Sequence, residues 1–512
     1  MITSISVIFL FFLLIVIIAI CVGVAFWNQN QKLKQLQKEV MHPHKKERST
    51  SEKKSLADKL EKESPSPTES PSIHRPRYIN EISNIEISDE FENAFSLLEN
   101  MRDCVFITGK AGTGKSTLLK YFVANTKKQV VVLAFTGVAA LNVGGETIHS
   151  FFKFPPRPIM DDDIRERSNR EVYKLIDTIV IDEISMVRAD LLDAIDKFMR
   201  INGRDISKPF GGIQVVFFGD LFQLSPIVSG TEESQYISSL YKSPWFFDAN
   251  VMKSHPYKLI ELTKVYRQKD ASFIALLDSI RTGSFDNSHL NQLNQRFQVR
   301  QLQNGSTPNI TLTSTNNLAA QINEAKLNQL VSPEFTYLGT IEGDFPKKAL
   351  PTDTVLKFKQ GAQVMFVKND LSRRWVNGTI GKVYSLDKDS IHVEITENGT
   401  QSIYPVGIEK WEILKYKFDS ISHRLDTEVV GAFTQYPLRL AWAVTIHKSQ
   451  GLTFDSVVID LGYGAFAYGQ TYVALSRCTS YEGISLKKRI GRSDVRVDSE
   501  VNRYFSNFGT LQ

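Results

Sequence analysis

The sequence contains few cysteines and only a weak excess of positive charge. It holds 3 cysteines in 512 residues, and no two of them form a CxxC pair. This spacing predicts neither a zinc site nor a disulfide framework, and it favours a reducing compartment for the soluble part. The net charge of +5 does not by itself indicate a nucleic-acid partner, because a local basic groove and a neutral surface can give the same sum.

Basic residues are also missing from the start of the chain. No lysine or arginine precedes Lys32, and the segment from Val7 to Trp27 carries no charge. A cleaved signal peptide normally begins with basic residues and has a shorter apolar region. A helix over this segment would span about 31 Å, which matches a hydrocarbon core of about 30 Å. We therefore expect residues 1–27 to form a retained transmembrane anchor.

The residues after this span predict its orientation and a tether. The basic residues from Lys32 to Arg48 place the body of the chain in the cytoplasm by the positive-inside rule, with the N-terminus outside. Residues 28–80 are mostly charged or Ser/Pro-rich and poor in large apolar groups, which predicts a disordered linker. No internal repeat is present.

A phosphate-binding loop is the clearest motif in the sequence. The segment FITGKAGTGKSTLL, from Phe106 to Leu119, matches the pattern GxxxxGK[ST] between an apolar strand and an amphipathic helix. Glycines in this pattern let backbone N–H groups approach phosphates, the lysine reaches the β and γ oxygens, and the Ser116 hydroxyl ligates Mg²⁺. The alternative is a glycine-rich turn without a ligand. The residues predicted to cradle the nucleotide are Gly109, Lys110, Ala111, Gly112, Thr113, Gly114, Lys115, Ser116 and Thr117.

Two further apolar runs end in polar residues that suit phosphate chemistry. TIVIDEISMV ends its apolar run at Asp182 and Glu183, so we expect Asp182 to hold Mg²⁺ and Glu183 to orient and deprotonate the attacking water. GGIQVVFFGDLFQLSPI places Gln223 in the loop after the next strand. Its amide can reach the γ-phosphate and report its presence, although a polar loop cap is the alternative.

Several longer segments resemble one enzyme family. They are AFTGVAALNVGGETIHSFF (Ala134 to Phe152), KPFGGIQVVFFGDLFQLSP (Lys208 to Pro226), LTKVYRQ (Leu262 to Gln268), TLTSTNNLAAQIN (Thr311 to Asn323), GAQVMFVKND (Gly361 to Asp370), WVNGTIGKV (Trp375 to Val383), AVTIHKSQGLTFDSVVIDL (Ala443 to Leu461) and TYVALSRCTS (Thr471 to Ser480). Over residues 85–490, in family order, the chain resembles the superfamily 1 DNA helicases of the Pif (petite integration frequency) and RecD-like branch.

The resemblance implies an α/β fold of two RecA-like lobes with parallel sheets and ATP in the cleft between them. The first lobe would cover residues 81–300. The second would cover 301–370 and 438–512, with a small β-barrel inserted at 371–437. The resemblance also implies that Arg477 and the segment around Gly451 face the nucleotide from the second lobe.

The resemblance further implies that Arg267 points at the γ-phosphate. An arginine that arrives from the facing lobe would make hydrolysis depend on closure. A surface salt bridge is the alternative for either arginine.

Single-stranded DNA is the partner that the resemblance implies, lying across both lobes. Hydroxyls, a lysine and backbone amides contact phosphates without reading sequence. Phe151 and Phe152 are candidates for stacking on bases, with core packing as the alternative. The residues that match the family's strand contacts are Thr136, His149, Thr313, Ser314, Thr445, His447 and Lys448.

The implied activity is an ATP- and Mg²⁺-dependent DNA helicase of 5′-to-3′ polarity that serves replication, repair or recombination. The sequence departs from the family by the N-terminal anchor and by lacking the glutamine that reads adenine, where Glu92 and Asn93 stand instead. Other nucleoside triphosphates therefore stay open as substrates. RNA also stays open as the nucleic acid that is unwound. A nucleic-acid-stimulated ATPase that does not unwind and a non-catalytic membrane scaffold are the alternative functions.

Overall fold

The first sheet of the protein is parallel and carries the phosphate loop. The computed structural model describes residues 87–509, except 156, 229, 256, 300–308, 398–399 and 420–423. The sheet has six strands in the order β3-β2-β4-β5-β1-β6, and every neighbouring pair is parallel. Its strands are β1 (Cys104–Gly109), β2 (Val130–Ala134), β3 (Glu146–Thr147), β4 (Thr178–Asp182), β5 (Gln214–Phe218) and β6 (Tyr257–Leu262).

Both faces of the central strands of this sheet are buried. In β1, Phe106 packs into one apolar cluster, whereas its neighbours Val105 and Ile107 pack into another. This is the period-2 alternation of a strand covered on both sides, which explains why the strands appear in the sequence as continuous apolar runs.

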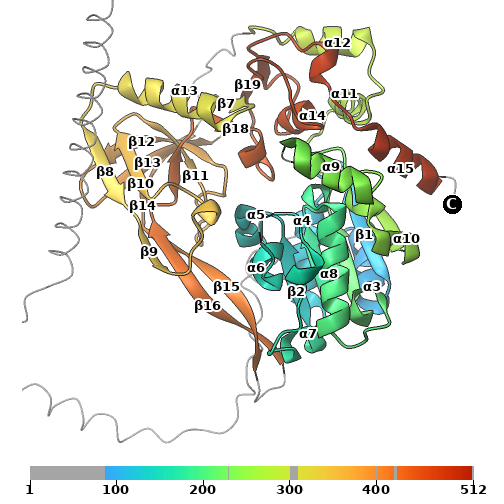
Figure 1. Cartoon of the computed structure of the whole chain (residues 1–512). Helices are drawn as coiled ribbons and strands as arrows, with labels where there is room; N and C mark the ends of the chain where they lie inside the picture. Colours follow the sequence, from blue (N-terminus) through green and yellow to red (C-terminus); the bar gives the residue numbers. More distant parts are fainter. Residues whose placement is uncertain are drawn as a thin grey trace, which may run out of the picture. The chain divides into compact units, whose positions relative to one another are not determined.

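Helices surround the first sheet (Figure 1). They are α3 (Asp89–Asn100), α4 (Lys115–Asn125), α5 (Gly137–Asn142), α6 (Ile148–Phe152), α7 (Glu171–Leu175), α8 (Ala189–Asn202), α9 (Gly230–Leu240) and α10 (Asn250–Ser254). Short 3-10 turns join them at η1 (Asp161–Asp163), η2 (Ile184–Met186), η3 (Pro209–Gly212) and η4 (Phe246–Asp248). Thr136 and Thr147 cap α5 and α6 by accepting backbone N–H bonds, which satisfies donors that a helix start leaves free.

The second sheet is also parallel, with the order β18-β7-β19-β20. Its strands are β7 (Ile310–Thr313), β18 (Ala443–Thr445), β19 (Val457–Asp460) and β20 (Ile484–Leu486). The remaining helices and turns are α11 (Ala271–Thr282), α12 (Asn287–Asn294), α13 (Asn316–Asn328), α14 (Gln470–Leu475), α15 (Ser499–Gly509), η5 (Lys347–Ala349), η6 (His447–Ser449) and η7 (Arg492–Asp494). Two parallel α/β sheets agree with the expected fold class.

The residues that follow β6 associate with the second sheet. Arg296, just beyond α12, donates to the carbonyl of Ile484 at 2.8 Å, and Phe297 bridges to Leu486 of β20. Figure 1 shows α11 and α12 beside α14. The parallel strands of the first sheet thus end at Leu262, well before the expected boundary at residue 300.

The insertion between α13 and β18 is antiparallel and larger than residues 371–437. It starts at β8, because β8 and β10 pair with each other and β11 pairs with β12 and β17. Tyr337, Phe358, Val364 and Trp375 share a separate apolar core there. The strands are β8 (Glu334–Leu338), β9 (Thr340–Gly343), β10 (Val355–Lys359), β11 (Gln363–Phe366), β12 (Ile380–Leu386), β13 (Ile391–Glu397), β14 (Thr400–Val406), β15 (Glu409–Asp419), β16 (Arg424–Gln435) and β17 (Leu438–Leu440).

The β15–β16 hairpin of the insertion contacts the first sheet. The Tyr416 hydroxyl accepts the backbone N–H of Val132 at 3.0 Å, and its ring meets Phe151 edge-on. Gly137 at the start of α5 lies against Ala349 of η5, where a Cβ on the glycine would come within 2.6 Å of the alanine Cβ. The insertion and the first lobe therefore share a tightly packed contact.

The predicted anchor (1–27) and linker (28–80) lie outside the described residues. Within residues 87–509, apart from the gaps given above, the structure contains no helix that is both long and apolar enough to cross a bilayer.

Candidate nucleotide and nucleic-acid site

The phosphate loop has the backbone that its glycines predict. Gly112 and Gly114 adopt φ angles of +85° and +84°, a region that glycine enters at little cost. Space is equally restrictive, since a Cβ on Gly112 would lie 2.5 Å from Cβ of Arg267, and one on Gly114 would lie 2.8 Å from the Phe91 ring. Each glycine lets a neighbouring element approach the loop.

Lys115 points back over the loop that it follows. Its Nζ donates to the carbonyls of Gly109 at 2.6 Å and Lys110 at 2.9 Å. Desolvation lowers the pKa of Lys115 to about 8, and the nearby Asp220 carboxylate opposes this effect. An anionic phosphate at this position would restore the charged form of the lysine.

The acidic strand end lies in the same desolvated region. Asp182 ends β4 and accepts the N–H of Glu183 at 2.9 Å. Desolvation raises the pKa of both carboxyls. The charge of Glu183 raises the pKa of Asp182 further, and the charge of Asp220 raises that of Glu183. Carboxylates and a serine hydroxyl are hard oxygen donors of the kind that fit Mg²⁺, which uses one or two carboxylates together with phosphate oxygens and water. Ser116 and Asp182 are the residues that would hold the ion.

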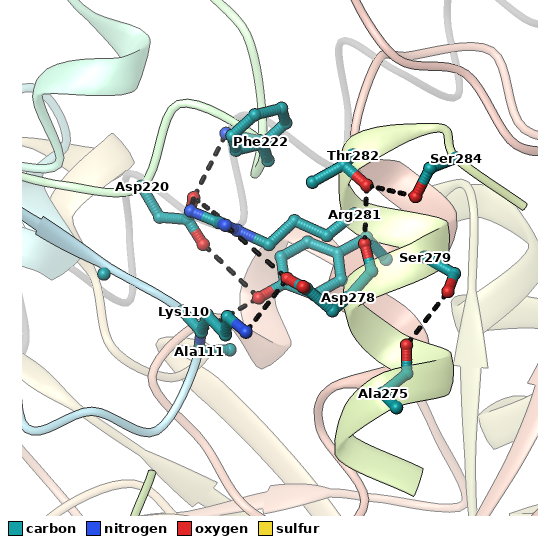
Figure 2. A network of polar contacts seen from close by, with 12 residues as sticks. Lys110, Ala111, Asp220, Phe222, Ala275, Asp278, Ser279, Arg281, Thr282 and Ser284 are labelled. Atoms are coloured by element: carbon teal, nitrogen blue, oxygen red, sulfur yellow. Dashed lines mark hydrogen bonds and ion pairs between the residues drawn. The ribbon is translucent and has the colours of Figure 1, made fainter. Parts of the chain in front are cut away.

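Asp220 collects donors from three segments of the chain. It is 1% exposed and pairs with Arg281 of α11 at 3.2 Å. It also accepts the N–H of Phe222 at 3.2 Å and the Gln223 side-chain amide at 3.3 Å. The Arg281 guanidinium lies over the Phe222 ring, and Lys110 of the phosphate loop pairs with Asp278 of the same helix (Figure 2). The predicted sensor Gln223 is thus held by a buried ion pair.

Tyr472 connects the phosphate loop to the second lobe. Its hydroxyl accepts the backbone N–H of Ala111 at 2.9 Å and donates to Asp220 at 3.4 Å. Burial raises the pKa of the phenol, so the hydroxyl keeps the proton that it donates. Sequence reasoning missed Tyr472, Asp220 and Arg281. The position of Tyr472 within TYVALSRCTS, five residues before Arg477, was the available signal.

The two predicted arginines lie next to each other. Arg267 donates to the carbonyl of Ser476 at 2.9 Å. Arg477 is 2% exposed, and it donates to the carbonyls of Val473 at 3.0 Å and Leu452 at 3.4 Å. Desolvation, with Arg267 as a like-charged neighbour, lowers the pKa of Arg477 to about 9, while Glu183 and Asp220 oppose this.

The segment around Gly451 wraps the Arg477 guanidinium. The carbonyls of Ser449 and Leu452 on either side of it both accept from Nη1. Gly451 itself has a φ of +77° and no atom within 4 Å of an added Cβ.

The residues predicted to contact single-stranded DNA lie at the ends of several helices and strands of the protein. Thr136 and His149 lie at α5 and α6, and Lys448 is exposed in η6 beside His447. Thr313, Ser314 and Thr445 are buried, and their hydroxyls bond within the protein.

Phe151 and Phe152 pack in the core at 6% and 0% exposure. These two rings therefore pack in the core, which was the alternative to the predicted base stacking.

Comparison with known proteins places this arrangement in one family. The sequence model of the family described as PIF1-like helicase matches residues 86–291. The ATP-dependent DNA helicase Pif1 of Bdellovibrio bacteriovorus is 31% identical over 441 residues, covering 84% of this chain and 94% of that protein. The mouse ATP-dependent DNA helicase PIF1 is 32% identical, covering 78% of this chain. The chain belongs to the Pif1-like helicase family.

The solved Pif1-like structures differ in how closely they match. Bacteroides Pif1 in complex with ADP-AlF4 aligns with a TM-score of 0.76 and 34% identity, covering 84% of this chain and 98% of that one. The same protein bound to ssDNA aligns with a TM-score of 0.61. The chain spans about 60% of the length of the mouse relative.

Positions 92 and 93, where the family's adenine-reading glutamine was expected, lie in helix α3. Glu92 and Asn93 are both exposed on α3. Phe91, their neighbour, packs against Gly114 of the phosphate loop.

We expect Arg477→Lys to slow ATP hydrolysis far more than it weakens ATP binding. A lysine lacks the planar fork that bonds the surrounding carbonyls and a transferring phosphoryl group. Arginine fingers contribute about 10³ to 10⁵ in rate, so kcat should fall by about 10³-fold. ATPase kinetics and single-stranded DNA titration at one fixed salt concentration measure both effects. Collapse of DNA binding with unchanged hydrolysis per bound complex would make Arg477 a strand contact instead.

We expect Tyr472→Phe to reduce DNA-stimulated kcat about 5- to 160-fold, the equivalent of two hydrogen bonds of about 0.5–1.5 kcal/mol each. The ring stays in the core while the bonds to Ala111 and Asp220 are lost. Tyr481→Phe is the matched control, because it removes a hydroxyl that donates to the carbonyl of Gln292. Equal kinetics for both variants would contradict a role for the Tyr472 hydroxyl in the cleft.

Proposed function

We propose that the protein is an ATP-dependent DNA helicase that translocates on single-stranded DNA and separates duplex strands. The observation that carries the proposal is the meeting of Lys115, Glu183, Arg267 and Arg477 in one desolvated cleft, where each changes the pKa of at least one of the others. These groups belong to the phosphate loop, an acidic strand end and the two arginine segments of a Pif1-like chain.

Each group has a distinct task in the proposed hydrolysis. Lys115 and the loop amides hold the phosphates, Gln223 reports the γ-phosphate, and Glu183 takes the proton of the attacking water. Mg²⁺, held by Ser116 and Asp182, would neutralise charge on the phosphate oxygens. Arg267 and Arg477 stabilise the charge that develops during transfer.

Closure of the cleft couples this chemistry to DNA. Arg281 and Tyr472 join the sensor loop to α11 and α14, so a change at Gln223 reaches elements that pack with the second sheet. Alternating closure and opening then moves the strand from one lobe to the other. The 5′-to-3′ direction and a role in replication, repair or recombination follow from family resemblance alone.

We further propose that the N-terminal span anchors this motor to a membrane, with the motor in the cytoplasm. The uncharged run from Val7 to Trp27 and the basic residues after it support this localisation.

We expect Lys115→Ala to abolish DNA-stimulated ATP hydrolysis and strand displacement while the fold survives. The variant removes the cation that contacts the β and γ oxygens. Turnover with and without single-stranded DNA, a strand-displacement assay and circular dichroism provide the measurements. Lys127→Ala, at an exposed lysine just beyond the same helix, is the control and should retain both activities. Normal ATP turnover by Lys115→Ala would refute the ATPase assignment. If the unmodified protein instead hydrolyses ATP in response to DNA but does not separate the strands, the protein is a nucleic-acid-stimulated ATPase that does not unwind.

We expect the full chain to sediment with membranes and to resist high-salt and carbonate extraction, because a spanning helix is held by burial of apolar surface and not by charge. A chain that begins at Glu81 should stay in the supernatant and still unwind DNA. Fractionation followed by immunoblotting measures this, and release of the full chain by carbonate would contradict the anchor.

A further inference from the structure

The loop between β19 and α14 presents an unusual group of exposed aromatic rings. Tyr463 is 109% exposed, Phe466 57% and Tyr468 43%. Only two other aromatic residues in the described part of the chain, Tyr266 and Tyr384, are classed as exposed. Aromatic side chains otherwise pack mainly in the interior of the described part of this protein. Three exposed rings within six residues therefore indicate a binding surface.

The backbone of this loop is fixed by hydrogen bonds. The N–H of Phe466 donates to the Gln470 side chain at 3.0 Å, and Arg496 donates to the Phe466 carbonyl at 2.7 Å. Gly462 and Gly464, with φ angles of +58° and +127°, flank Tyr463. At the two ends of the segment, the N–H of Gly462 donates to Asp460 and the N–H of Gly469 donates to the carbonyl of Arg496. The rings are therefore displayed on an ordered support, which lowers the entropy cost of binding.

The loop adjoins two residues that the family resemblance assigns to the DNA path. The Ser314 hydroxyl donates to the carbonyl of Leu461 at 3.2 Å, and the His447 ring stacks on Phe466 with centroids 6.4 Å apart and planes 18° apart. The aromatic loop therefore lies next to the residues of the second sheet that are predicted to contact DNA.

Cationic groups accompany the rings. Lys448 is exposed next to His447, and the Arg496 guanidinium lies 5.9 Å from the centre of the Tyr468 ring. Positive charge beside flat apolar rings suits a polymer of alternating phosphates and bases, because phosphates meet the cations while bases stack on the rings. A purely apolar protein partner would gain nothing from these charges.

We propose that Tyr463, Phe466 and Tyr468 form a stacking platform for unpaired bases of a single-stranded nucleic acid. The proposal rests on the proposed helicase function and extends it with a subsite that contacts bases and not phosphates. Every base has a flat face, so the platform is tolerant of sequence, as a translocating enzyme requires.

The end of the loop contacts the predicted nucleotide sensor. A Cβ on Gly469 would lie 2.4 Å from the carbonyl oxygen of Phe222 and 2.1 Å from that of Gln223. The same residue leads directly into α14, which carries Tyr472. The loop that carries the platform therefore directly contacts the segment that contains Gln223, the predicted γ-phosphate sensor.

The test compares two labelled oligonucleotides of equal length, oligothymidylate and an abasic deoxyribose-phosphate chain, by fluorescence anisotropy with the full-length protein at one fixed salt concentration. Tyr463→Ala removes a ring that touches little else, and it should weaken oligothymidylate binding about 5- to 150-fold. Binding of the abasic chain should change less than about twofold, because its phosphates still meet the same cations. Tyr463→Trp should restore the loss.

Tyr384→Ala, at a 50% exposed tyrosine of β12, is the matched control and should leave both affinities unchanged. An equal loss on both oligonucleotides, or no loss on either, in Tyr463→Ala would overturn the platform while leaving the helicase assignment intact. Failure of the unmodified protein to bind any single strand would instead remove the proposed function and the platform with it.

Discussion

A single buried carboxylate holds the nucleotide cleft together. Asp220 is almost completely shielded from water, and a buried charge is strongly unfavourable unless it is paired and hydrogen-bonded. Arg281 supplies the opposite charge, and Phe222, Gln223 and Tyr472 supply further donors. These donors come from α11, α14 and the loop after β5, so none of these segments can move away without leaving part of Asp220 unsatisfied.

This arrangement explains why the cleft is sensitive to its occupant. Burial desolvates Lys115 and lowers its pKa. It also raises the pKa of Glu183 and lowers that of Arg477, so that each of the three groups is shifted toward its neutral form. A multiply charged, anionic nucleotide supplies the missing electrostatic partner for the two cations, Lys115 and Arg477, and favours the neutral form of Glu183 further. Phosphate binding is therefore favoured by the desolvation of these two cations.

The local parts of the site could be predicted from sequence, and the long-range parts could not. The phosphate loop and the Asp182–Glu183 strand end are contiguous motifs whose backbone follows from glycine content and apolar runs. Tyr472, in contrast, meets Asp220 across 252 residues of sequence, and no periodicity encodes such a pairing. Its place in the structure depends on how α14 docks on the phosphate loop.

The pairing partners of short apolar runs could not be read from the sequence for a related reason. The GAQVMFVKND segment was assigned to the second lobe by motif, yet Gln363–Phe366 forms β11 between two antiparallel neighbours. A short apolar run has the same appearance in a parallel and in an antiparallel sheet, and only its partners distinguish them. The aromatic pair Phe151 and Phe152 likewise needed the packing of α6 to show that both rings are internal.

The position of the insertion has a consequence for how such an enzyme can change over time. Strands β7 and β18 pair in parallel with helix α13 between them in sequence, and the Asn323 side chain of α13 both donates to and accepts from the backbone of Ala443 at 2.8 Å. The helix is thus fastened to the next strand whatever lies in between. Residues between α13 and β18 can therefore lengthen or shorten while the register of the second sheet is preserved, provided that the contacts of Tyr416 and Ala349 with the first lobe are kept.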